Sequence, residues 1–260
     1  MELNYHRAGS GEPLLLLHGI GSRWQVWQPV LADLETAREV IAVDLPGFGA
    51  SPMPPPGTPA GVSSLTPMVC DFLDELGLVA PHAAGNSLGG WIALELAKRG
   101  RARTVTALSP AGFQNAREAV FQRSTMWTTV RAARVAAPLA PPLLAPPLAR
   151  RLVFAQLVAH AERIPHADAV GHLRALARAP RFDETLSAIN ADRFDGGEQI
   201  EVPVTIAWGE HDRLLLPRQA RRARSAIPGA RLLMLRGCGH VPTYDDPPQI
   251  ARVLLEGSSM

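Results

Sequence analysis

Residues 81–99 read PHAAGNSLGGWIALELAKR, and this stretch decides the fold. A short strand is predicted from Pro81 to Gly85, and a turn flanked by glycines follows it. The apolar residues from Leu88 to Arg99 then predict a buried helix. A tight connection from a strand into a helix is typical of α/β proteins with a parallel sheet.

The same alternation extends on both sides of this stretch. The apolar runs Leu14–Leu17 and Val40–Val43 suit central strands that are buried on both faces. Between them, apolar residues recur at helical spacing from Trp24 to Leu34, which completes a strand–helix–strand unit. A helix near Val62–Leu76 and a strand at Thr104–Leu108 continue the pattern. We therefore predict a doubly wound α/β fold.

The alternation stops between Gln114 and Ile189, where the chain is rich in Ala, Arg and Pro. We expect an α/β core from residues 1–113 and 190–260, with residues 114–189 as an inserted helical cap. The predicted cap consists of helices at Glu118–Val135, Leu148–Arg163 and Ala167–Ala179, and of a linker, Ala137–Pro147, whose prolines exclude a long regular helix. The core then resumes with a strand at Pro203–Trp208, a helix at Arg218–Ala226, a strand at Arg231–Leu235 and a helix at Pro248–Leu255.

The turn inside the opening stretch carries a candidate nucleophile. Gly85-Asn86-Ser87-Leu88-Gly89 has the G-x-S-x-G pattern of a nucleophile elbow, in which a strained turn lifts the serine hydroxyl above the sheet. The flanking glycines let the strand and helix backbones pass closely. The same letters also occur in ordinary Gly/Ser turns, and the strand and helix around Ser87 favour the elbow.

A serine nucleophile needs a base and a group that orients the base. His240 follows the last predicted strand within a glycine turn, where a loop can deliver an imidazole. Asp212 follows the strand that ends at Trp208, so we expect it to hold the tautomer of His240. Glu210 is the alternative acid, and His211 is interpreted as a neighbour of the acid.

An oxyanion formed during attack on a carbonyl needs backbone N–H donors. The loop His18-Gly19-Ile20-Gly21 follows the first central strand, so the N–H groups of Ile20 and Leu88 are the predicted donors. We interpret His18 as a structural residue that fixes this loop rather than as a second base.

Five motifs in order resemble the α/β-hydrolase superfamily over nearly the whole chain. They are His18-Gly19-Ile20-Gly21, Asp44-Leu45-Pro46-Gly47-Phe48-Gly49-Ala50-Ser51, Gly85-Asn86-Ser87-Leu88-Gly89-Gly90, Gly209-Glu210-His211-Asp212 and Gly237-Cys238-Gly239-His240. The resemblance implies a mostly parallel eight-stranded sheet flanked by helices, a helical cap inserted after the sixth strand, and a Ser87–His240–Asp212 triad. It also implies that Asp44 belongs to a structural turn.

The resemblance limits the chemistry. Dehalogenases and epoxide hydrolases of this superfamily carry aspartate at the elbow, whereas this chain carries Ser87. Serine with an oxyanion hole suits a carbonyl and an acyl-enzyme that water hydrolyses. The expected activity is therefore that of a serine hydrolase on a fairly apolar ester, lactone or thioester.

The cap and its surroundings supply the candidate pocket. The predicted lining residues are Trp24, Phe113, Met126, Trp127, Leu143, Leu144, Leu152, Phe154, Leu157 and Val241. Each of them could instead pack in a hydrophobic core, and Trp24 and Trp27 could serve helix packing alone.

Three other functions stay open. The elbow also resembles that of enzymes that hydrolyse a carbon–carbon bond in a vinylogous diketone, but those enzymes usually carry an aromatic residue straight after the histidine, and here Val241 follows. Cofactor-free perhydrolysis would use the same triad. A small-molecule receptor on this fold is the non-enzymatic alternative.

Composition excludes several further classes. The chain has 260 residues, of which 47% are hydrophobic and 19% charged, with a net charge of +2, so neither disorder nor nucleic-acid binding is expected. Cys70 and Cys238 cannot form a disulfide framework, and neither a metal-binding spacing nor a dinucleotide fingerprint occurs. We expect no metal, cofactor or membrane partner, and a cytoplasmic location. The partners expected are a small-molecule substrate and water, and a homodimer is left open.

Overall fold

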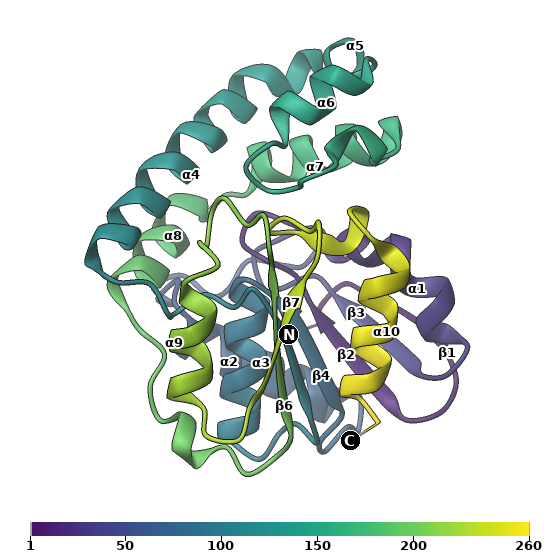
Figure 1. Ribbon diagram of the computed structural model, residues 1–260, viewed down its shortest axis with the longest axis vertical. Coiled ribbons are helices and arrows are strands. Elements are labelled where there is room, and N and C mark those ends of the chain that lie inside the picture. Colours follow the sequence, from purple (N-terminus) through teal and green to yellow (C-terminus); the bar gives the residue numbers. More distant parts are fainter. Residues whose placement is uncertain (1, 260) are drawn as a thin grey trace.

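The structure, a computed structural model, describes residues 2–259 and contains one sheet of seven strands in the order β1-β3-β2-β4-β5-β6-β7 (Figure 1). The strands are β1 (Tyr5–Gly9), β2 (Pro13–Leu17), β3 (Glu39–Val43), β4 (His82–Asn86), β5 (Val105–Leu108), β6 (Val204–Gly209) and β7 (Arg231–Leu235). Strand β1 pairs antiparallel with β3, and all other neighbours are parallel. The prediction of a mostly parallel α/β sheet is confirmed.

The expected number of strands was wrong, because the described residues form seven strands rather than eight. The segment before β2 forms β1, a strand at one edge of the sheet that had not been predicted. A bend at residues 10–12 leads directly from β1 into β2. The N-terminal segment therefore adds one strand to the sheet.

Helices cover both faces of the sheet. Helices α2 (Val62–Glu75), α3 (Leu88–Lys98) and α9 (Gln219–Ala226) lie on one face, and α1 (Gln28–Glu35) and α10 (Pro247–Gly257) lie on the other (Figure 1). Along β2, Leu15 and Leu17 join the first hydrophobic cluster, whereas Leu14 and Leu16 join the second. This alternation explains why the strand is apolar at every position from Leu14 to Leu17.

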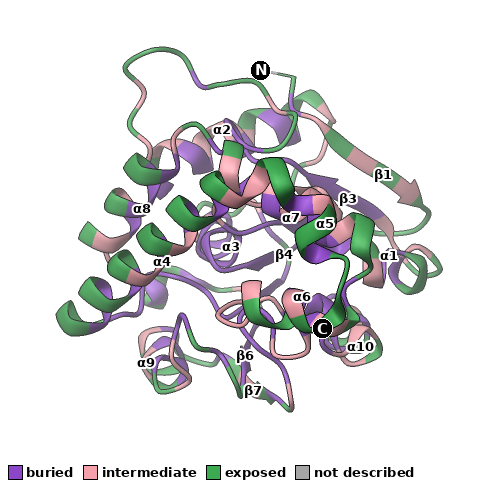
Figure 2. Cartoon of the chain, turned by 90° about the horizontal axis from the view of Figure 1, so that it is seen from above, coloured by how far each residue is buried: buried purple, intermediate pink, exposed green. Residues whose placement is uncertain are grey.

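The helical insertion lies between β5 and β6. It comprises α4 (Ala116–Ala136), α5 (Ala140–Leu144), α6 (Pro147–Val153), α7 (His166–Arg178) and α8 (Phe182–Ala191). Seen from above, α4, α5, α6 and α7 lie over the sheet, with exposed residues on their outer sides (Figure 2). The proline-rich linker forms short helical pieces, as its sequence predicts, but α8 is a separate helix that had not been predicted.

Among residues 2–259, no helix combines the length and the apolar character that are needed to cross a bilayer.

Candidate active site

The elbow holds Ser87 in an unusual backbone conformation, with φ of 57° and ψ of −115°. Residues other than glycine rarely adopt these backbone angles, and such backbone strain is typical of turns at functional sites. Its N–H donates to the carbonyl of Leu108 (3.0 Å), and its carbonyl accepts from the N–H of Trp91 (3.1 Å). These bonds fix the turn between β4 and α3. Ser87 is buried, with 6% of its surface exposed.

Glycines make the elbow possible because the strand and the helix pass very closely. A Cβ at Gly85 would collide with the backbone of Gly89, and a Cβ at Gly89 would collide with the carbonyl of Leu17. The two glycines of the motif are therefore required by backbone packing.

Gly89→Ala is expected to lower the free energy of unfolding by about 2–3 kcal/mol, because the colliding atoms belong to the backbone and cannot rotate away. Urea denaturation measures the change. Gly61→Ala is the matched control, since a Cβ there meets nothing closer than 3.7 Å. Equal stability of Gly89→Ala and the wild type would contradict the claim that close packing of Gly89 on the Leu17 backbone requires glycine.

Asp212 and His240 form a buried pair at the same sheet edge. Asp212 follows β6 and His240 follows β7, and the carboxyl ends of parallel strands meet at one edge. Nδ1 of His240 donates to Oδ2 of Asp212 at 2.8 Å. The N–H groups of Leu214 and Leu215 donate to Oδ1 of Asp212 (2.9 and 2.8 Å), which orients the carboxylate. With the Nδ1 proton held by Asp212, Nε2 of neutral His240 is free to accept a proton.

Asn86 joins the elbow to the histidine loop, and sequence reasoning gave it no role. Its Nδ2 donates to the carbonyls of Leu108 (3.1 Å) and His240 (2.8 Å). The side chain thus connects β4 and β5 to the backbone of His240. Its position beside Ser87 in the motif is the signal that could have identified it.

A second buried carboxylate, Asp245, holds the histidine loop against the insertion. It accepts hydrogen bonds from the N–H groups of Gly239 (2.7 Å) and His160 (2.7 Å). Burial raises the pKa of Asp245, and the hydrogen bonds from Gly239 and His160 oppose that rise. The N–H of Val241 also donates to the carbonyl of Leu157 (2.7 Å). The loop that carries His240 is therefore fixed from both the core and the insertion.

The two predicted oxyanion donors are placed beside Ser87. Ile20 lines the same cavity as Ser87, and Leu88 is the first residue of α3, where helical N–H groups lack an intrahelical acceptor. Among residues 2–259, neither backbone N–H donates to another group. Neither N–H group is therefore engaged by the described part of the chain.

His18 has the contacts of a structural residue. It is fully buried, its Nε2 accepts from the N–H of Leu45 (3.0 Å), and its Nδ1 donates to the carbonyl of Gly19 (2.7 Å). Burial lowers the pKa of His18, which favours this neutral form. The side chain therefore fixes the turns at both strand ends.

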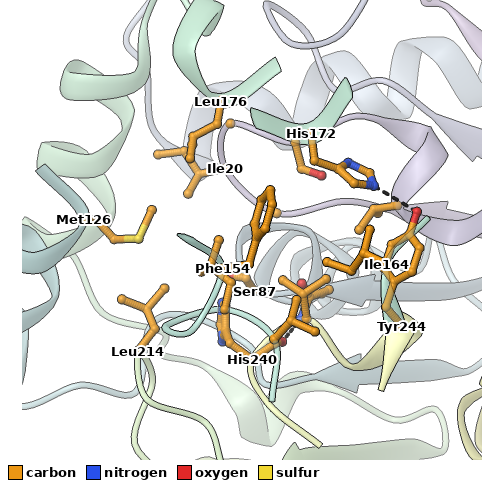
Figure 3. A pocket seen from close by; sticks show the side chains of 18 residues that line it. Ile20, Ser87, Met126, Phe154, Ile164, His172, Leu176, Leu214, His240 and Tyr244 are labelled. Carbon is orange, nitrogen blue, oxygen red and sulfur yellow. Dashed lines mark hydrogen bonds between the residues drawn. The ribbon is translucent and has the colours of Figure 1, made fainter. Parts of the chain in front are cut away.

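A cavity joins Ser87 and His240 and contains about 720 Å³ of space, part of it open to solvent. Figure 3 shows Ser87 and His240 among its lining side chains. Apolar groups dominate the rest of the lining, which includes Ile20, Val26, Met126, Phe154, Leu157, Val158, Ile164, Leu176, Leu214 and Val241. Of the predicted pocket residues, the structure brings Met126, Phe154, Leu157 and Val241 to this cavity.

Three predicted pocket residues lie away from the cavity and pack elsewhere. The Trp24 ring stacks on His6 with ring centroids 5.0 Å apart. Phe113 packs against Phe194, with centroids 5.2 Å apart. Leu144 is fully buried in the hydrophobic cluster. For these residues the pocket prediction was wrong, because their apolar surfaces pack against other side chains of the protein.

Three more predicted pocket residues face solvent. Leu143 and Leu152 are both exposed. Trp127 is also exposed, and the guanidinium of Arg131 lies 4.4 Å from its ring centre. Met126 and Trp127 are consecutive on α4, so they point in different directions, and only Met126 reaches the cavity.

The cavity has a polar end that sequence reasoning missed. His172 of α7 and Tyr244, near His240, both line it, and Nε2 of His172 lies 2.9 Å from the Tyr244 hydroxyl (Figure 3). That hydroxyl donates to Oδ2 of Asp168 at 3.2 Å. The Tyr244 oxygen therefore accepts from the Nε2 proton of His172. The only signal in the sequence was the one-turn spacing of Asp168 and His172.

Burial, and to a lesser extent the charge of Arg23, lower the pKa of His172 to about 4. The group binds a proton in the unfolded chain below about pH 6.5 but stays neutral in the folded protein down to about pH 4. Its contribution to stability is complete above pH 6.5 and is lost as the pH falls toward 4.

His172→Gln is expected to reduce this loss of stability in acid by about 3 kcal/mol between pH 6.5 and pH 4. Urea denaturation at several pH values measures the slope for each variant. His211→Gln, at an exposed position, should keep the slope of the wild type. Equal slopes for His172→Gln and His211→Gln would contradict a neutral, buried His172.

Among residues 2–259, no group of three or more His, Cys, Asp or Glu side chains is arranged to hold a metal ion.

Comparison with known proteins places the chain in a family. A model of the alpha/beta hydrolase family matches residues 14–253. The chain therefore belongs to the alpha/beta hydrolase family, which confirms the resemblance that its motifs carry.

Individual relatives differ in activity. The chain is 33% identical over 199 residues to the epoxide hydrolase EphH of Mycobacterium tuberculosis, and the match covers 70% of this chain and 87% of that protein. It is 30% identical over 254 residues to the dihydrolipoyllysine-residue acetyltransferase component of an acetoin cleaving system of Cupriavidus necator. That match covers 93% of this chain and 62% of the relative, so the chain spans less than two thirds of it.

A solved esterase from Exiguobacterium antarcticum superimposes with a TM-score of 0.79, over 99% of this chain and 96% of that chain. The two are 18% identical, so this likeness shows the fold alone. The family and the relatives together support hydrolase activity.

Proposed function

We propose that the protein is a serine hydrolase that cleaves a carboxylic ester, lactone or thioester of a fairly apolar small molecule. The observation that carries this proposal is that Ser87, in a strained elbow, shares one cavity with His240, whose Nδ1 is bound to buried Asp212. Ser87 would serve as the nucleophile, His240 as the base and Asp212 as the acid that orients the base.

The reaction starts when Ser87 Oγ attacks the carbonyl carbon of the substrate. Nε2 of His240 takes the hydroxyl proton, and Asp212 stabilises the imidazolium that forms. The N–H groups of Ile20 and Leu88 bind the oxyanion. Collapse of the tetrahedral intermediate expels the alcohol or thiol, which receives the proton from His240. Water, activated by His240, then hydrolyses the acyl-enzyme.

The lining of the cavity supports an apolar substrate. Met126 of α4, Phe154 after α6 and Leu176 of α7 come from the insertion, whereas Ile20 and Leu214 come from the core. We assign residues 114–189 the role of a cap that covers the substrate and excludes water. Because the insertion provides much of the apolar wall, its residues would select the substrate.

The identity of the nucleophile separates this proposal from epoxide hydrolysis, the activity of the relative EphH. The branch that opens epoxides uses aspartate at the elbow to form an alkyl ester. Serine at position 87 would form an alkyl ether instead, and water does not hydrolyse an ether readily. Ser87 therefore supports acyl transfer.

A panel of substrates tests the proposal. The purified protein is assayed with nitrophenyl esters of increasing acyl length, with an aryl epoxide, and with a vinylogous diketone. We expect hydrolysis of the esters, with kcat/KM highest for a short or medium acyl chain, and no epoxide opening. Preferred cleavage of the diketone would replace the ester proposal with carbon–carbon hydrolysis. Binding of an ester without turnover would support a receptor.

A further inference from the structure

A second cleft lies beside the catalytic cavity, between the core and α7. Two pairs of consecutive residues lie between the cavity and the cleft. Ser22 lines the cavity and Arg23 the cleft. Likewise, His172 lines the cavity and Gly171 the cleft. The polar side chains that line the cleft are Asn4, Arg23, Gln25, Ser51, Arg174 and Arg178, together with the carboxylate of Asp44. The cleft therefore adjoins the polar end of the cavity without being part of it.

The charge in this cleft is unbalanced. Arg174 and Arg178 lie one turn apart on α7, and Arg23 comes from the loop after β2. Within residues 2–259, none of these three guanidinium groups forms an ion pair or a side-chain hydrogen bond.

The one carboxylate in the cleft is already engaged by other groups. Asp44 is 1% exposed and accepts from the N–H of Trp24 (2.6 Å), the N–H of Ala50 (2.8 Å) and Nδ2 of Asn4 (2.7 Å). It therefore belongs to the structural turn of residues 44–51. Its donors are neutral and leave its charge in place, so the cleft carries three positive charges against one negative charge.

Arg23 provides the second observation. Its Nε is buried and has no hydrogen-bond partner among the described residues. A Cβ at position 171 would collide with Nη2 of Arg23, so Gly171 leaves the space that the guanidinium occupies. A buried, unpaired donor is costly unless a ligand or water accepts from it. Part of the hydrogen-bonding capacity of Arg23 is thus unused.

We propose that Arg23, Arg174 and Arg178 form an anion-binding site for a phosphate or carboxylate group of a small molecule. Guanidinium groups bind both kinds of oxyanion through paired, charge-assisted hydrogen bonds. The anion is either a remote group of the substrate or a separate ligand. Binding itself does not depend on the proposed ester hydrolysis, so calorimetry tests it even if no ester is cleaved.

Titration calorimetry with inorganic phosphate and with succinate tests the site on the full chain. We expect saturable binding to the wild type at low ionic strength, weakened at least about tenfold in Arg174→Gln. Arg221→Gln is the matched control, because Arg221 is exposed on α9 away from the cleft. Arg23→Gln should also weaken binding, and a melting curve establishes that it is folded. The absence of binding to the wild type, or equal weakening in Arg174→Gln and Arg221→Gln, would overturn the proposal.

A kinetic arm identifies the source of the anion. Two nitrophenyl esters are compared that differ only in a terminal carboxylate on the acyl chain. If the anion belongs to the substrate, phosphate raises KM for the charged ester alone, and Arg174→Gln removes that effect. If calorimetry shows binding and phosphate changes KM for neither ester, the site takes a separate ligand.

Discussion

Ser87→Ala is expected to lower kcat for nitrophenyl ester hydrolysis by about 10⁴–10⁶-fold, because the triad acts as a unit and the substitution removes the attacking oxygen. The binding cavity should survive, since Ser87 is small and its turn is fixed by backbone hydrogen bonds. Steady-state kinetics at saturating ester gives the change in kcat. A urea denaturation curve establishes that the variant folds.

The matched control is Ser124→Ala, at an exposed position on α4, which should keep the activity of the wild type. A folded Ser87→Ala protein that retains more than about one tenth of the activity would contradict nucleophilic attack by Ser87. It would instead point to a base or to bound water that acts directly on the ester.

Asp212→Asn should lower kcat by about 10⁴-fold at neutral pH while the fold is maintained. The amide oxygen can replace Oδ1, which accepts from the N–H groups of Leu214 and Leu215. The amide NH₂ would then face Nδ1 of His240 and donate to it. The imidazole would carry its proton on Nε2, so it could not accept one from Ser87.

Glu210→Gln distinguishes the two acids that the sequence offers. Glu210 is exposed, and among residues 2–259 its Oε2 accepts one hydrogen bond, from the N–H of Gly237 at 3.2 Å. Its replacement should change kcat less than about threefold, because it touches neither His240 nor the cavity. A loss in Glu210→Gln as large as that in Asp212→Asn would contradict the assignment of the acid.

The sequence predicted most of the core because the core depends on local patterns. Apolar runs such as Leu14–Leu17 specify strands buried on both faces, and the glycines around Ser87 specify a close crossing of strand and helix. The order of Ser87, Asp212 and His240 along parallel strands was enough to expect all three at one sheet edge. In the structure the three residues do follow parallel strands at that edge, and their catalytic role is a prediction.

The pocket was predicted less well, because its lining depends on how the insertion docks. Periodicity placed Met126 and Trp127 on the same helix, but it could not say which residue would face the sheet. Trp24 and Phe113 were misassigned for a similar reason. Each packs against a ring that is distant in sequence or belongs to another element, His6 for Trp24 and Phe194 for Phe113. The polar end was missed for the same reason, because Tyr244 meets His172 only after docking.

The edge strand β1 was missed for a different reason. Residues 5–9 are YHRAG, which alternate between exposed and half-buried and lack a run of apolar residues. Such an edge strand is specified by its antiparallel pairing with β3, and a search for apolar runs does not detect it.

The most direct test of the account is the intact mass of the protein after exposure to a fluorophosphonate, with wild type, Ser87→Ala and His240→Ala treated in parallel. An activated serine attacks the phosphorus and keeps the phosphonyl group. We predict one adduct on the wild type, none on Ser87→Ala, and labelling slowed by at least about 10³-fold in His240→Ala. An unlabelled wild type, or equal labelling of wild type and Ser87→Ala, would contradict an activated nucleophile at the elbow.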